Sequence, residues 1–421
     1  MKKILLLTAG MLLIAASCTK NEVVEVNQDG NEIQYSVVAN KATKAADIFC
    51  NNNMPASFTV YAESSDNKTY ISGDVISQQN GSWVNTSGIR FWPNGLSLDF
   101  YAFVNENGTW GWNPENEEPT TLTGFTVPSG VADQKDFLYA VKMNQSKGMG
   151  TAGEGAETSE SVTETTKPVT LNFRHALSQI VFNAKNTNPN LYVEISEVSI
   201  VGVSSKGNFT FPITDTDAKK YGAHNGGVTT ISDYASGWGT WSSLSESAMY
   251  SVGFTKVEVP GDSSVKDLTT ANDKPDGEDV TKEFSSKAML LLPQTVAAWS
   301  PAENPTVLEN GNYAKDKGAY FLVKCAIYNV AGNEFAEGDT ALWGSTSEHK
   351  NVAIPVNPTW EQGKKYIYTF VFGDGGGYDP ENPDPDPDDP DPVLIPVTFT
   401  VSVDDFVPVD VDPDIDMNPE S

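Results

Sequence analysis

Apolar and polar residues alternate along much of this 421-residue chain with a period of two, the pattern of a β-strand that buries one face. The clearest stretch is 397–407, where the apolar positions that alternate with Thr and Ser are Val397, Phe399, Val401 and Val403. Such a strand exposes an apolar face and unpaired backbone groups, so it needs a sheet edge to pair with. Two possibilities stay open: the strand folds back on its own chain, or it pairs with another chain.

A second amphipathic strand is expected near the N-terminus, at residues 32–40. Its apolar positions, which polar residues separate, are Ile33, Tyr35 and Val37. Immediately after it, Lys41 and Lys44 lie among small residues, a composition typical of an exposed site that a trypsin-like protease cuts. A solvated loop without processing explains the same composition.

The body between these two strands follows the β pattern as well, because Val, Thr and aromatic residues recur and windows of helical period are scarce. The expected strands are 58–62, 96–104, 125–127, 137–141, 169–173, 180–182, 193–203, 320–328, 352–355 and 365–372. We further expect a hairpin turn at 204–208. The segment 214–283 is rich in Gly, Ser, Thr and Asp and predicts short strands and long loops. The chain is therefore predicted to be all-β.

Composition and charge narrow the possible partners. Lys and Arg number 27 against 56 Asp and Glu, which gives a formal net charge of −29. Phosphate binding requires clusters of Lys and Arg, so a nucleic-acid partner is not expected. The hydrophobic content of 39% and the aromatic content of 10% suit packed cores rather than disorder. The length is typical of two or three domains.

Two stretches without an apolar face divide the chain. Residues 144–167 are rich in Gly, Ser, Thr and Glu and predict a surface loop at a domain boundary. Residues 379–392 contain six prolines and seven acidic residues, so ladder pairing is blocked and like charges repel. This tract predicts an extended spacer. Its acids could also bind calcium, but the Gly-centred loop of known calcium motifs is missing, and no metal site is predicted.

The expected organisation follows from these stretches. One β domain spans 45–167, a second spans 168–378, an Asp/Pro linker spans 379–395, and the final strand with its tail spans 396–421. The N-terminus has a basic start, Met1-Lys2-Lys3, and then an apolar run at 4–16 that is too short to span a membrane stably.

The residues before Cys18 are small and resemble a bacterial lipoprotein signal. On that resemblance residues 1–17 are the signal peptide, cleavage precedes Cys18, and acyl chains on this residue anchor the protein in the membrane. Residues 18–44 then comprise a tether and the first strand. An ordinary secretory signal with an accidental Cys is the alternative.

Candidate catalytic and metal-binding residues are few. The three histidines, His175, His224 and His349, share no metal-ligand spacing, and no Gly-x-Ser-x-Gly elbow, P-loop or dinucleotide fingerprint occurs. His175 lies beside apolar strand positions, which favours a structural hydrogen-bonding role over a role as a base. Cys50 and Cys325 match no zinc or redox motif, and we interpret them as unpaired thiols, with pairing as the alternative. We expect neither enzyme activity nor a cofactor.

Nine Trp residues make sugar binding conceivable, because aromatic faces stack on sugars. The candidates are Trp110, Trp112, Trp238 and Trp241. Packing in the core is the competing interpretation and is favoured here. A surface glycan-binding lipoprotein that stays monomeric is therefore the alternative function.

Several segments, taken in order along nearly the whole chain, resemble the fimbrillin (type V pilin) family of Bacteroidetes-type bacteria. Besides the lipoprotein signal and the first strand with its basic end, they are Phe91-Trp92-Pro93, Leu98-Asp99-Phe100-Tyr101-Ala102-Phe103, Leu171-Asn172-Phe173-Arg174-His175-Ala176-Leu177-Ser178-Gln179-Ile180, Gly363-Lys364-Lys365-Tyr366, and the final strand at 397–406. Each segment is moderately specific, and their order makes the resemblance stronger than any one of them.

The resemblance implies two transthyretin-like β-sandwich domains, export as an outer-membrane lipoprotein, and assembly into a cell-surface fimbrium that supports adhesion. In those pilins a trypsin-like protease cuts after a basic residue and removes the first strand. By position, the cut here falls between Lys44 and Ala45, with Lys41 as the second candidate. Lys in place of the usual Arg departs from the family and leaves the identity of the protease open.

In the same family, the groove that the first strand vacates accepts the C-terminal strand of another subunit. The residues carried over to this donor strand are Val397, Phe399, Val401, Val403 and Phe406. A chain with such a strand suits a stalk or adaptor position in the pilus. The implied partners are other pilus subunits, the protease, the outer membrane before processing, and a host or glycan receptor.

Overall fold

The computed structural model describes residues 32–39, 55–104, 109–111, 120–147, 168–216, 238–269, 288–304, 306–332, 334–381 and 395–405. The regular structure in these stretches is β-strand, apart from a 3-10 turn at Val131–Asp133, and they contain no α-helix. None of their elements is a helix long and apolar enough to cross a membrane. The prediction of an all-β chain is confirmed.

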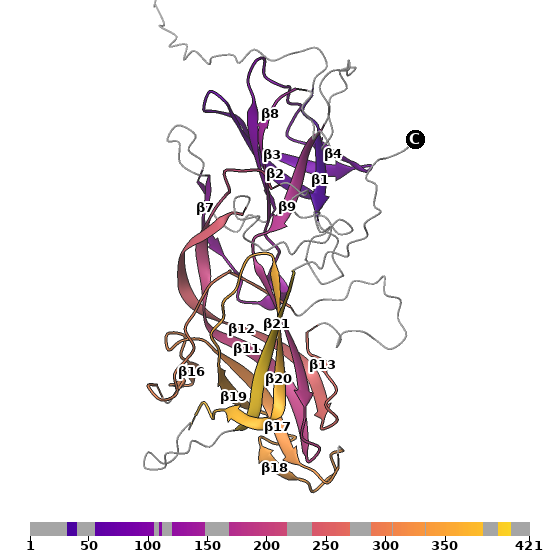
Figure 1. Ribbon diagram of the computed structural model, residues 1–421, viewed down its shortest axis with the longest axis vertical. Coiled ribbons are helices and arrows are strands. Elements are labelled where there is room, and N and C mark those ends of the chain that lie inside the picture. Colours follow the sequence, from indigo (N-terminus) through magenta and orange to yellow (C-terminus); the bar gives the residue numbers. More distant parts are fainter. Residues whose placement is uncertain are drawn as a thin grey trace, which may run out of the picture.

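A closed barrel occupies one end of the elongated molecule, at the top of Figure 1. In order around the barrel, its strands are β1 (Tyr35–Ala39), β4 (Ser82–Asn85), β3 (Lys68–Gln79), β2 (Ser57–Ser64), β5 (Leu98–Val104), β8 (Leu138–Gln145) and β9 (Val169–His175). Alternate strand positions supply its interior, with Phe58, Phe100 and Phe173 among the largest side chains. The period of two in the sequence thus accounts for both the strands and the barrel core.

Two further sheets form the other end of the molecule. The first has the strand order β13 (Lys266–Asp267), β10 (Ser178–Asn186), β20 (Lys364–Gly377) and β21 (Ile395–Asp405), with β14 (Met289–Leu291) also on β10. The second has the order β18 (Thr340–Trp343), β17 (Tyr320–Asn329), β11 (Leu191–Thr210), β7 (Thr121–Thr126) and β6 (Thr109–Gly111), with β12 (Thr240–Pro260) on β11 and β19 (Lys350–Pro355) on β17. A small ladder joins β15 (Leu308–Glu309) to β16 (Asn312–Tyr313).

The strand pairing crosses the domain boundary expected at residue 168. β9 follows that boundary in sequence, yet it pairs with β1 and β8 in the barrel. β6 and β7 precede it, yet β7 pairs with β11 of the second sheet. The chain therefore passes between the two ends of the molecule more often than a simple division into two consecutive domains implies.

Two expectations about the second sheet are wrong. Residues 204–208 form no hairpin turn, because β11 continues through them and pairs with β12 on one side and β7 on the other. Similarly, the expectation of short strands in 214–283 is wrong, because the described part of this segment contains β12, which is 21 residues long; most of the remainder, where long loops were expected, lies outside the described residues. Two flanking ladders hold β11 extended, and β11 in turn supports a long polar strand that has one solvent-exposed face.

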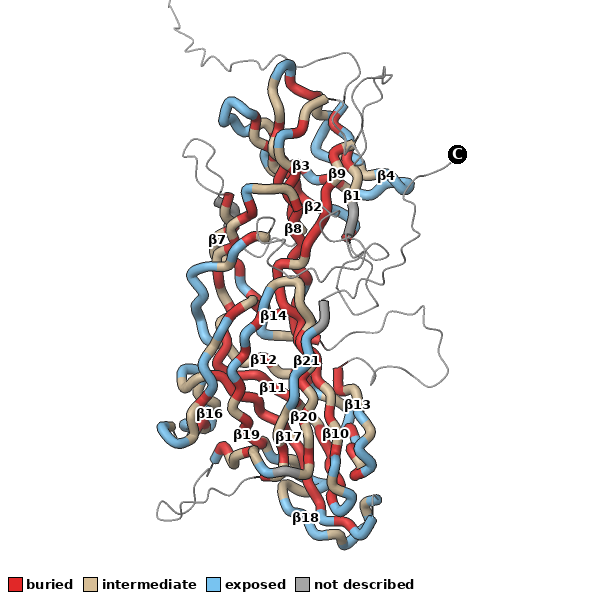
Figure 2. The backbone as a smooth tube through the Cα atoms, viewed as in Figure 1, coloured by how far each residue is buried: buried red, intermediate tan, exposed pale blue. Residues whose placement is uncertain are grey.

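One large hydrophobic cluster fills the space between the two lower sheets and extends toward the barrel, as the red segments of Figure 2 indicate. Phe182, Phe321 and Phe370 pack at its centre, with ring centroids 5.4–5.9 Å apart. Phe137 and Tyr139 of the β8 region belong to the same cluster. The barrel is therefore connected to the sheets by buried aromatic packing as well as by the chain itself.

Candidate strand-binding groove

The first strand lies between β9 and β4 and completes the barrel wall. β1 runs parallel to β9 in continuous register from Tyr35↔Val169 to Ala39↔Phe173. Before the strand begins, the Val169 N–H donates to the carbonyl of Gln34 at 2.7 Å, and the Ile33 N–H donates to the carbonyl of Arg90 at 2.7 Å. An N-terminal segment that the sequence marks as separable therefore fills a slot in the barrel.

The side chains of this segment are part of the barrel core. Ile33 and Tyr35 are 6% and 5% exposed, and Val37 packs against the same cluster. The Tyr35 ring makes edge contacts with Phe58 and Phe100 at centroid distances of 6.5 and 6.2 Å. Without this strand, the barrel wall would be open between β9 and β4, and the rings of Phe58 and Phe100 would be exposed to water.

The Tyr35 hydroxyl is buried and has no hydrogen-bond partner. Burial raises the pKa of this phenol above its ordinary value of 10, and the nearby Asp74 carboxylate raises it further. A buried hydroxyl without a partner costs free energy, because it gives up its hydrogen bonds to water. The packing of the Tyr35 ring therefore stabilises β1 in the barrel, whereas its hydroxyl does not.

The two sides of β1 are held unequally. Toward β9 the ladder is continuous, and the side chains of Ser36 and Thr170 are hydrogen-bonded at 2.9 Å. Toward β4 the described pairing is the single pair Tyr35↔Trp83. A cleft of about 570 Å³ lies along this side, between β1, β4 and Arg90. The β1–β4 seam is therefore the weaker side of the slot.

An ion pair fixes the rim of this seam. Arg90 donates to the Asp74 carboxylate through Nε at 2.7 Å and Nη2 at 2.9 Å, and Asn85 Nδ2 donates to it at 2.7 Å. These hydrogen bonds, that of Arg90 above all, lower the pKa of Asp74 from its ordinary value. Sequence reasoning did not identify Asp74 or Arg90; an Asp inside an otherwise amphipathic strand was the available signal.

The C-terminal strand lies on its own chain in this structure. β21 runs antiparallel to β20, with Val397 opposite Phe372 and Val403 opposite Tyr366. Of the two possibilities that the sequence left open, the described conformation is the fold-back.

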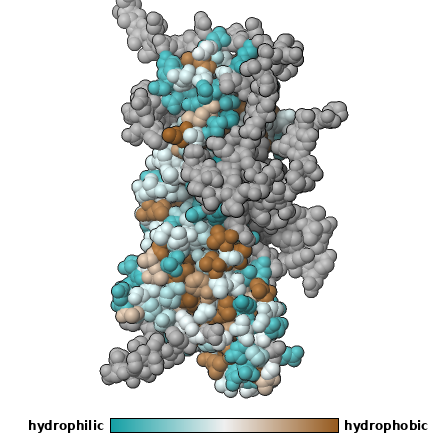
Figure 3. Space-filling model, in the orientation of Figure 1, coloured by the Kyte–Doolittle hydropathy of each residue, from teal (hydrophilic) through white to brown (hydrophobic). Residues whose placement is uncertain are grey.

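This docking buries only half of the apolar face of β21. Ile395 and Val397 are 4% and 0% exposed, and the Phe399 ring contacts Phe321 and Tyr368. Val401 and Val403 are 48% and 53% exposed. Figure 2 shows the change along β21, and Figure 3 shows hydrophobic side chains gathered on this face of the lower half. The strand is anchored at one end and presents apolar residues at the other.

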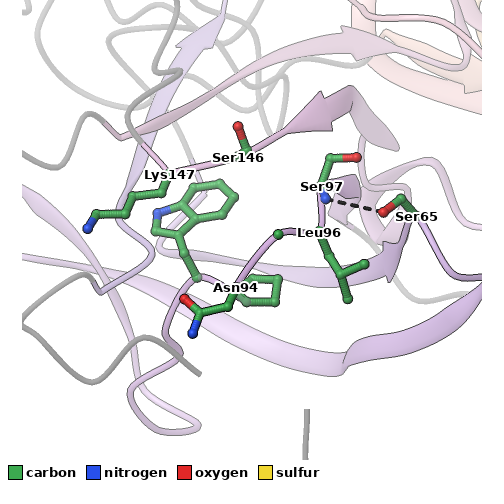
Figure 4. A pocket seen from close by; sticks show the side chains of 9 residues that line it. Ser65, Asn94, Leu96, Ser97, Ser146 and Lys147 are labelled. Carbon is green, nitrogen blue, oxygen red and sulfur yellow. Dashed lines mark hydrogen bonds between the residues drawn. The ribbon is translucent and has the colours of Figure 1, made fainter. Parts of the chain in front are cut away.

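A separate polar pocket of about 500 Å³ opens beside the barrel, shown in Figure 4. Ser65, Asn94, Ser97 and Lys147 line it together with Trp92, and the Ser97 N–H donates to Ser65 Oγ at 3.3 Å. Trp92 is only 2% exposed, so its ring offers no free face on which a sugar could stack.

Two of the four tryptophans considered for sugar binding pack against the main core. The Trp241 ring contacts Phe125 and Phe209, and its Nε1 donates to the carbonyl of Ala176 at 2.7 Å. Trp238 packs against the core with the Arg174 guanidinium 4.7 Å from its ring centroid. These contacts agree with the interpretation that places the rings in the core.

The histidines make structural contacts where the structure describes them. His175 Nδ1 lies 2.7 Å from the buried Asp136 carboxylate. His349 lies 2.9 Å from Ser196 Oγ and 3.4 Å from Glu194. In the described stretches no cluster of His, Cys, Asp and Glu has the geometry of a metal site. Cys325 is a free, buried cysteine whose pKa is raised by burial.

The remaining candidate residues lie outside the described part of the chain or have only their backbone described. Outside it are Cys18, Lys41, Lys44, Ala45, Cys50, Trp112, His224 and Phe406. Trp110 is described as part of the backbone of β6. The lipidation and processing residues thus remain sequence predictions.

Comparison with known proteins places the chain in a family. A family model described as fimbrillin-like matches residues 25–382. No curated protein matches the chain. A solved fimbrial protein from Bacteroides vulgatus is 13% identical with a TM-score of 0.47, over 90% of this chain and 100% of that one.

A solved fimbrilin from Porphyromonas gingivalis is also 13% identical, with a TM-score of 0.36, over 92% of this chain and 99% of that one. These structural likenesses are too remote to carry a conclusion, and the assignment rests on the family model, which covers most of the chain. The chain belongs to the fimbrillin-like family.

Proposed function

We propose that this chain is a subunit of a surface fimbrium that is exported as a lipoprotein through Cys18 and assembled by strand exchange. A protease cuts after Lys44, or after Lys41, and β1 leaves the barrel. The C-terminal strand of another subunit then fills the slot. The fibre formed in this way supports adhesion, and family membership favours such a fimbrial role.

The observation that carries this proposal is the position of β1. The segment 32–39 enters the barrel as a single strand and contributes buried side chains to its core. On the β4 side, β1 itself is joined by the one described pair Tyr35↔Trp83, and the residues before it by the Glu32↔Phe91 bridge and the Ile33 N–H bond to the Arg90 carbonyl. The expected cuts at Lys41 and Lys44 lie shortly after its last described residue. A cut at that point severs the covalent link of one wall strand and leaves the other strands of the barrel continuous with the rest of the chain.

The half-docked state of β21 supports the same proposal. Val401 and Val403 are about half exposed when β21 lies on β20. Burying the remaining surface of each would contribute roughly 1 kcal/mol, since full burial of a valine contributes about 1.5–3 kcal/mol. Transfer of the strand into a slot that covers more of its apolar face is therefore favourable, and the slot gains ladder partners.

Before the cut, the protein keeps itself unassembled. β1 occupies the slot while the chain is intact, so an incoming strand finds no open edge there. The tether before residue 32 would hold the precursor at the outer membrane through the acyl chains on Cys18. Cleavage then releases the subunit from this anchor and opens the slot in the same step.

The test is to cut the purified full-length chain at the basic segment and to follow its oligomers. We expect N-terminal sequencing to find Ala45, and gels of unboiled samples to show ladders that resist SDS because docked strands open slowly. Replacing both Phe399→Asp and Val401→Asp should abolish the ladders. The control is Thr398→Asp with Thr400→Asp, which adds the same charge on the opposite face of β21.

Ladders that persist in the Phe399→Asp, Val401→Asp variant would overturn the proposal. A chain that stays monomeric after a verified cut, or a surface protein that stays uncut and keeps the lipid on Cys18, would favour the monomeric glycan-binding lipoprotein. Retention on a polysaccharide column would then be the property to measure.

A further inference from the structure

We propose that the incoming strand enters the slot in one register and one direction, with Phe399 in the place of Tyr35 and the strand running parallel to β9. This inference rests on the proposed function and adds to it the residue that determines the register. It also identifies a driving force: the Tyr35 hydroxyl, which is buried in the uncut subunit, is absent from the strand that replaces it.

The pocket beneath Tyr35 is shaped for an aromatic ring. Tyr35 is 5% exposed, and its ring lies edge-on to both Phe58 and Phe100. Its hydroxyl is buried without a hydrogen-bond partner, so this polar atom does not stabilise the packing of the ring in the pocket. Phenylalanine carries the same ring without the polar atom. Phe399 is the aromatic residue among the described positions of β21.

The neighbouring positions match when Phe399 is placed on Tyr35. Val397 then falls on Ile33, which is buried, and Val401 falls on Val37, which packs against the barrel core. The residues between them are polar in both strands: Gln34 and Ser36 in the first, Thr398 and Thr400 in the second.

Other registers fit this slot less well. A shift by one residue would direct Thr398 or Thr400 into the aromatic pocket and turn the valines outward. A shift by two would place a valine against Phe58 and Phe100 and leave part of the pocket empty, which costs stability in a closely packed core. The aromatic side chain would then have to fit a position that Ile33 or Val37 occupies.

The apolar pattern of Val397, Phe399 and Val401 is symmetric about Phe399 and fits the slot in either strand direction. The position of Pro396 decides between the two directions. In the proposed direction, Pro396 falls at the position of Glu32, before the ladder with β9 begins. In the opposite direction, it falls at the position of Val38, inside that ladder. A proline has no N–H to donate and is tolerated at the first residue of a strand rather than within a paired one.

Cysteine crosslinking tests both register and direction. Ser36 is opposite Thr170 in the present ladder, so Thr400 of a donor should lie beside Thr170 of an acceptor. We would use the full chain with Cys18→Ser and Cys50→Ser and a specific protease site inserted after Lys44. Cut subunits carrying Thr170→Cys would be mixed with cut subunits carrying Thr400→Cys and oxidised.

The matched donors are Thr398→Cys and Ser402→Cys, each tested against the same Thr170→Cys acceptor. We expect the Thr400→Cys donor to give about tenfold more disulfide-linked dimer than either, because only facing residues meet the distance limits of a disulfide. A stronger crosslink from either matched donor overturns the register or direction, as does equal, weak crosslinking from all three while oligomers form. If no oligomers form at all, the proposed function itself fails.

A second measurement tests the hydroxyl directly. Phe399→Tyr should raise the dissociation rate of the oligomers about tenfold, because it restores a buried hydroxyl without a hydrogen-bond partner. Tyr35→Phe should slow the release of the cut N-terminal segment by a similar factor. Lys206→Gln, which lies outside both exchanging strands, is the control and should leave assembly unchanged. Unaltered dissociation and release in the two aromatic variants would show that the hydroxyl provides no driving force.

Discussion

At the scale of single residues, the Asp74 carboxylate holds the rim of the slot. It accepts two hydrogen bonds from Arg90 and one from Asn85, and its own side chain is 4% exposed. The carbonyl of Arg90 in turn accepts the N–H of Ile33. One buried carboxylate therefore connects strand β3, the Arg90 segment and the entry of β1.

Asp74→Asn should lower the free energy of unfolding by about 2 kcal/mol, because it removes the charge that the Arg90 guanidinium pairs with and leaves the side chain at this buried position without it. Denaturant unfolding followed by Trp fluorescence measures the change. Lys206→Gln is the matched control, since Lys206 and Glu246 form an ion pair that is largely exposed and should contribute little. Equal losses in the two variants would contradict this role of Asp74.

The same carboxylate predicts a pH dependence. Its pKa is lower in the folded protein than the ordinary value of 3.8, chiefly because of the hydrogen bond from Arg90. A group of this kind contributes stability that is complete above its unfolded pKa and is lost as the pH falls through its folded pKa. Wild-type stability should therefore fall below about pH 4, and more steeply than that of Asp74→Asn. Identical slopes in urea unfolding between pH 5 and pH 3 would rule this out.

At the scale of elements, β1 and β21 are two strands held incompletely. β1 has a full ladder on one side and one described pair on the other. β21 is joined to β20 along its length, but the apolar face of its second half is about half exposed. Strands that exchange partners must come from the less stable part of a fold, and these two meet that condition.

Hydrogen exchange should rank the strands accordingly. We expect the amides of β1 in the uncut chain to exchange at least about tenfold faster than those of β5, because β5 is paired along both edges, with β2 and β8. Mass spectrometry of peptic peptides from the native protein provides the measurement, with β17, which is paired with β11 and β19, as a second protected reference. Equal protection of β1 and β5 would argue against easy release of the first strand.

At the scale of the whole molecule, the barrel and the two lower sheets are interdependent. The chain leaves the barrel after β5, supplies β6 and β7 to the second sheet, and returns as β8. β9 then continues through a short bend into β10 of the first sheet. Across the same junction, the Gln134 side chain accepts the N–H of Leu290 at 2.7 Å.

This connectivity predicts one cooperative unfolding transition for the full chain. A fragment that begins at residue 168 would lack β7, leave part of β11 unpaired, and carry β9 without its barrel partners. We expect it to be insoluble or to lack a sharp transition in calorimetry. Two separate transitions in the full chain, or a stable fragment 168–381, would show that the two ends fold independently.

The local pattern of residues was sufficient for the strands themselves and for the two that matter most to the site. The alternation at Ile33, Tyr35 and Val37, and again at Val397, Phe399 and Val401, predicted β1 and β21, because side-chain period is a local property of an extended chain. The same reasoning identified β9, β10, β17 and β20.

Pairing partners, in contrast, were decided by the tertiary structure, because a ladder joins residues that lie far apart in sequence. Nothing local shows that Tyr35 lies opposite Val169, that β7 extends β11, or that the polar residues of β12 form one long strand. The unpartnered hydroxyl of Tyr35 and the half-exposed end of β21 likewise depend on what surrounds them. The sequence by itself determined which segments are strands with an apolar face. The tertiary structure decided which strands pair and which apolar faces pack together, because burial depends on neighbours that only the folded chain brings together.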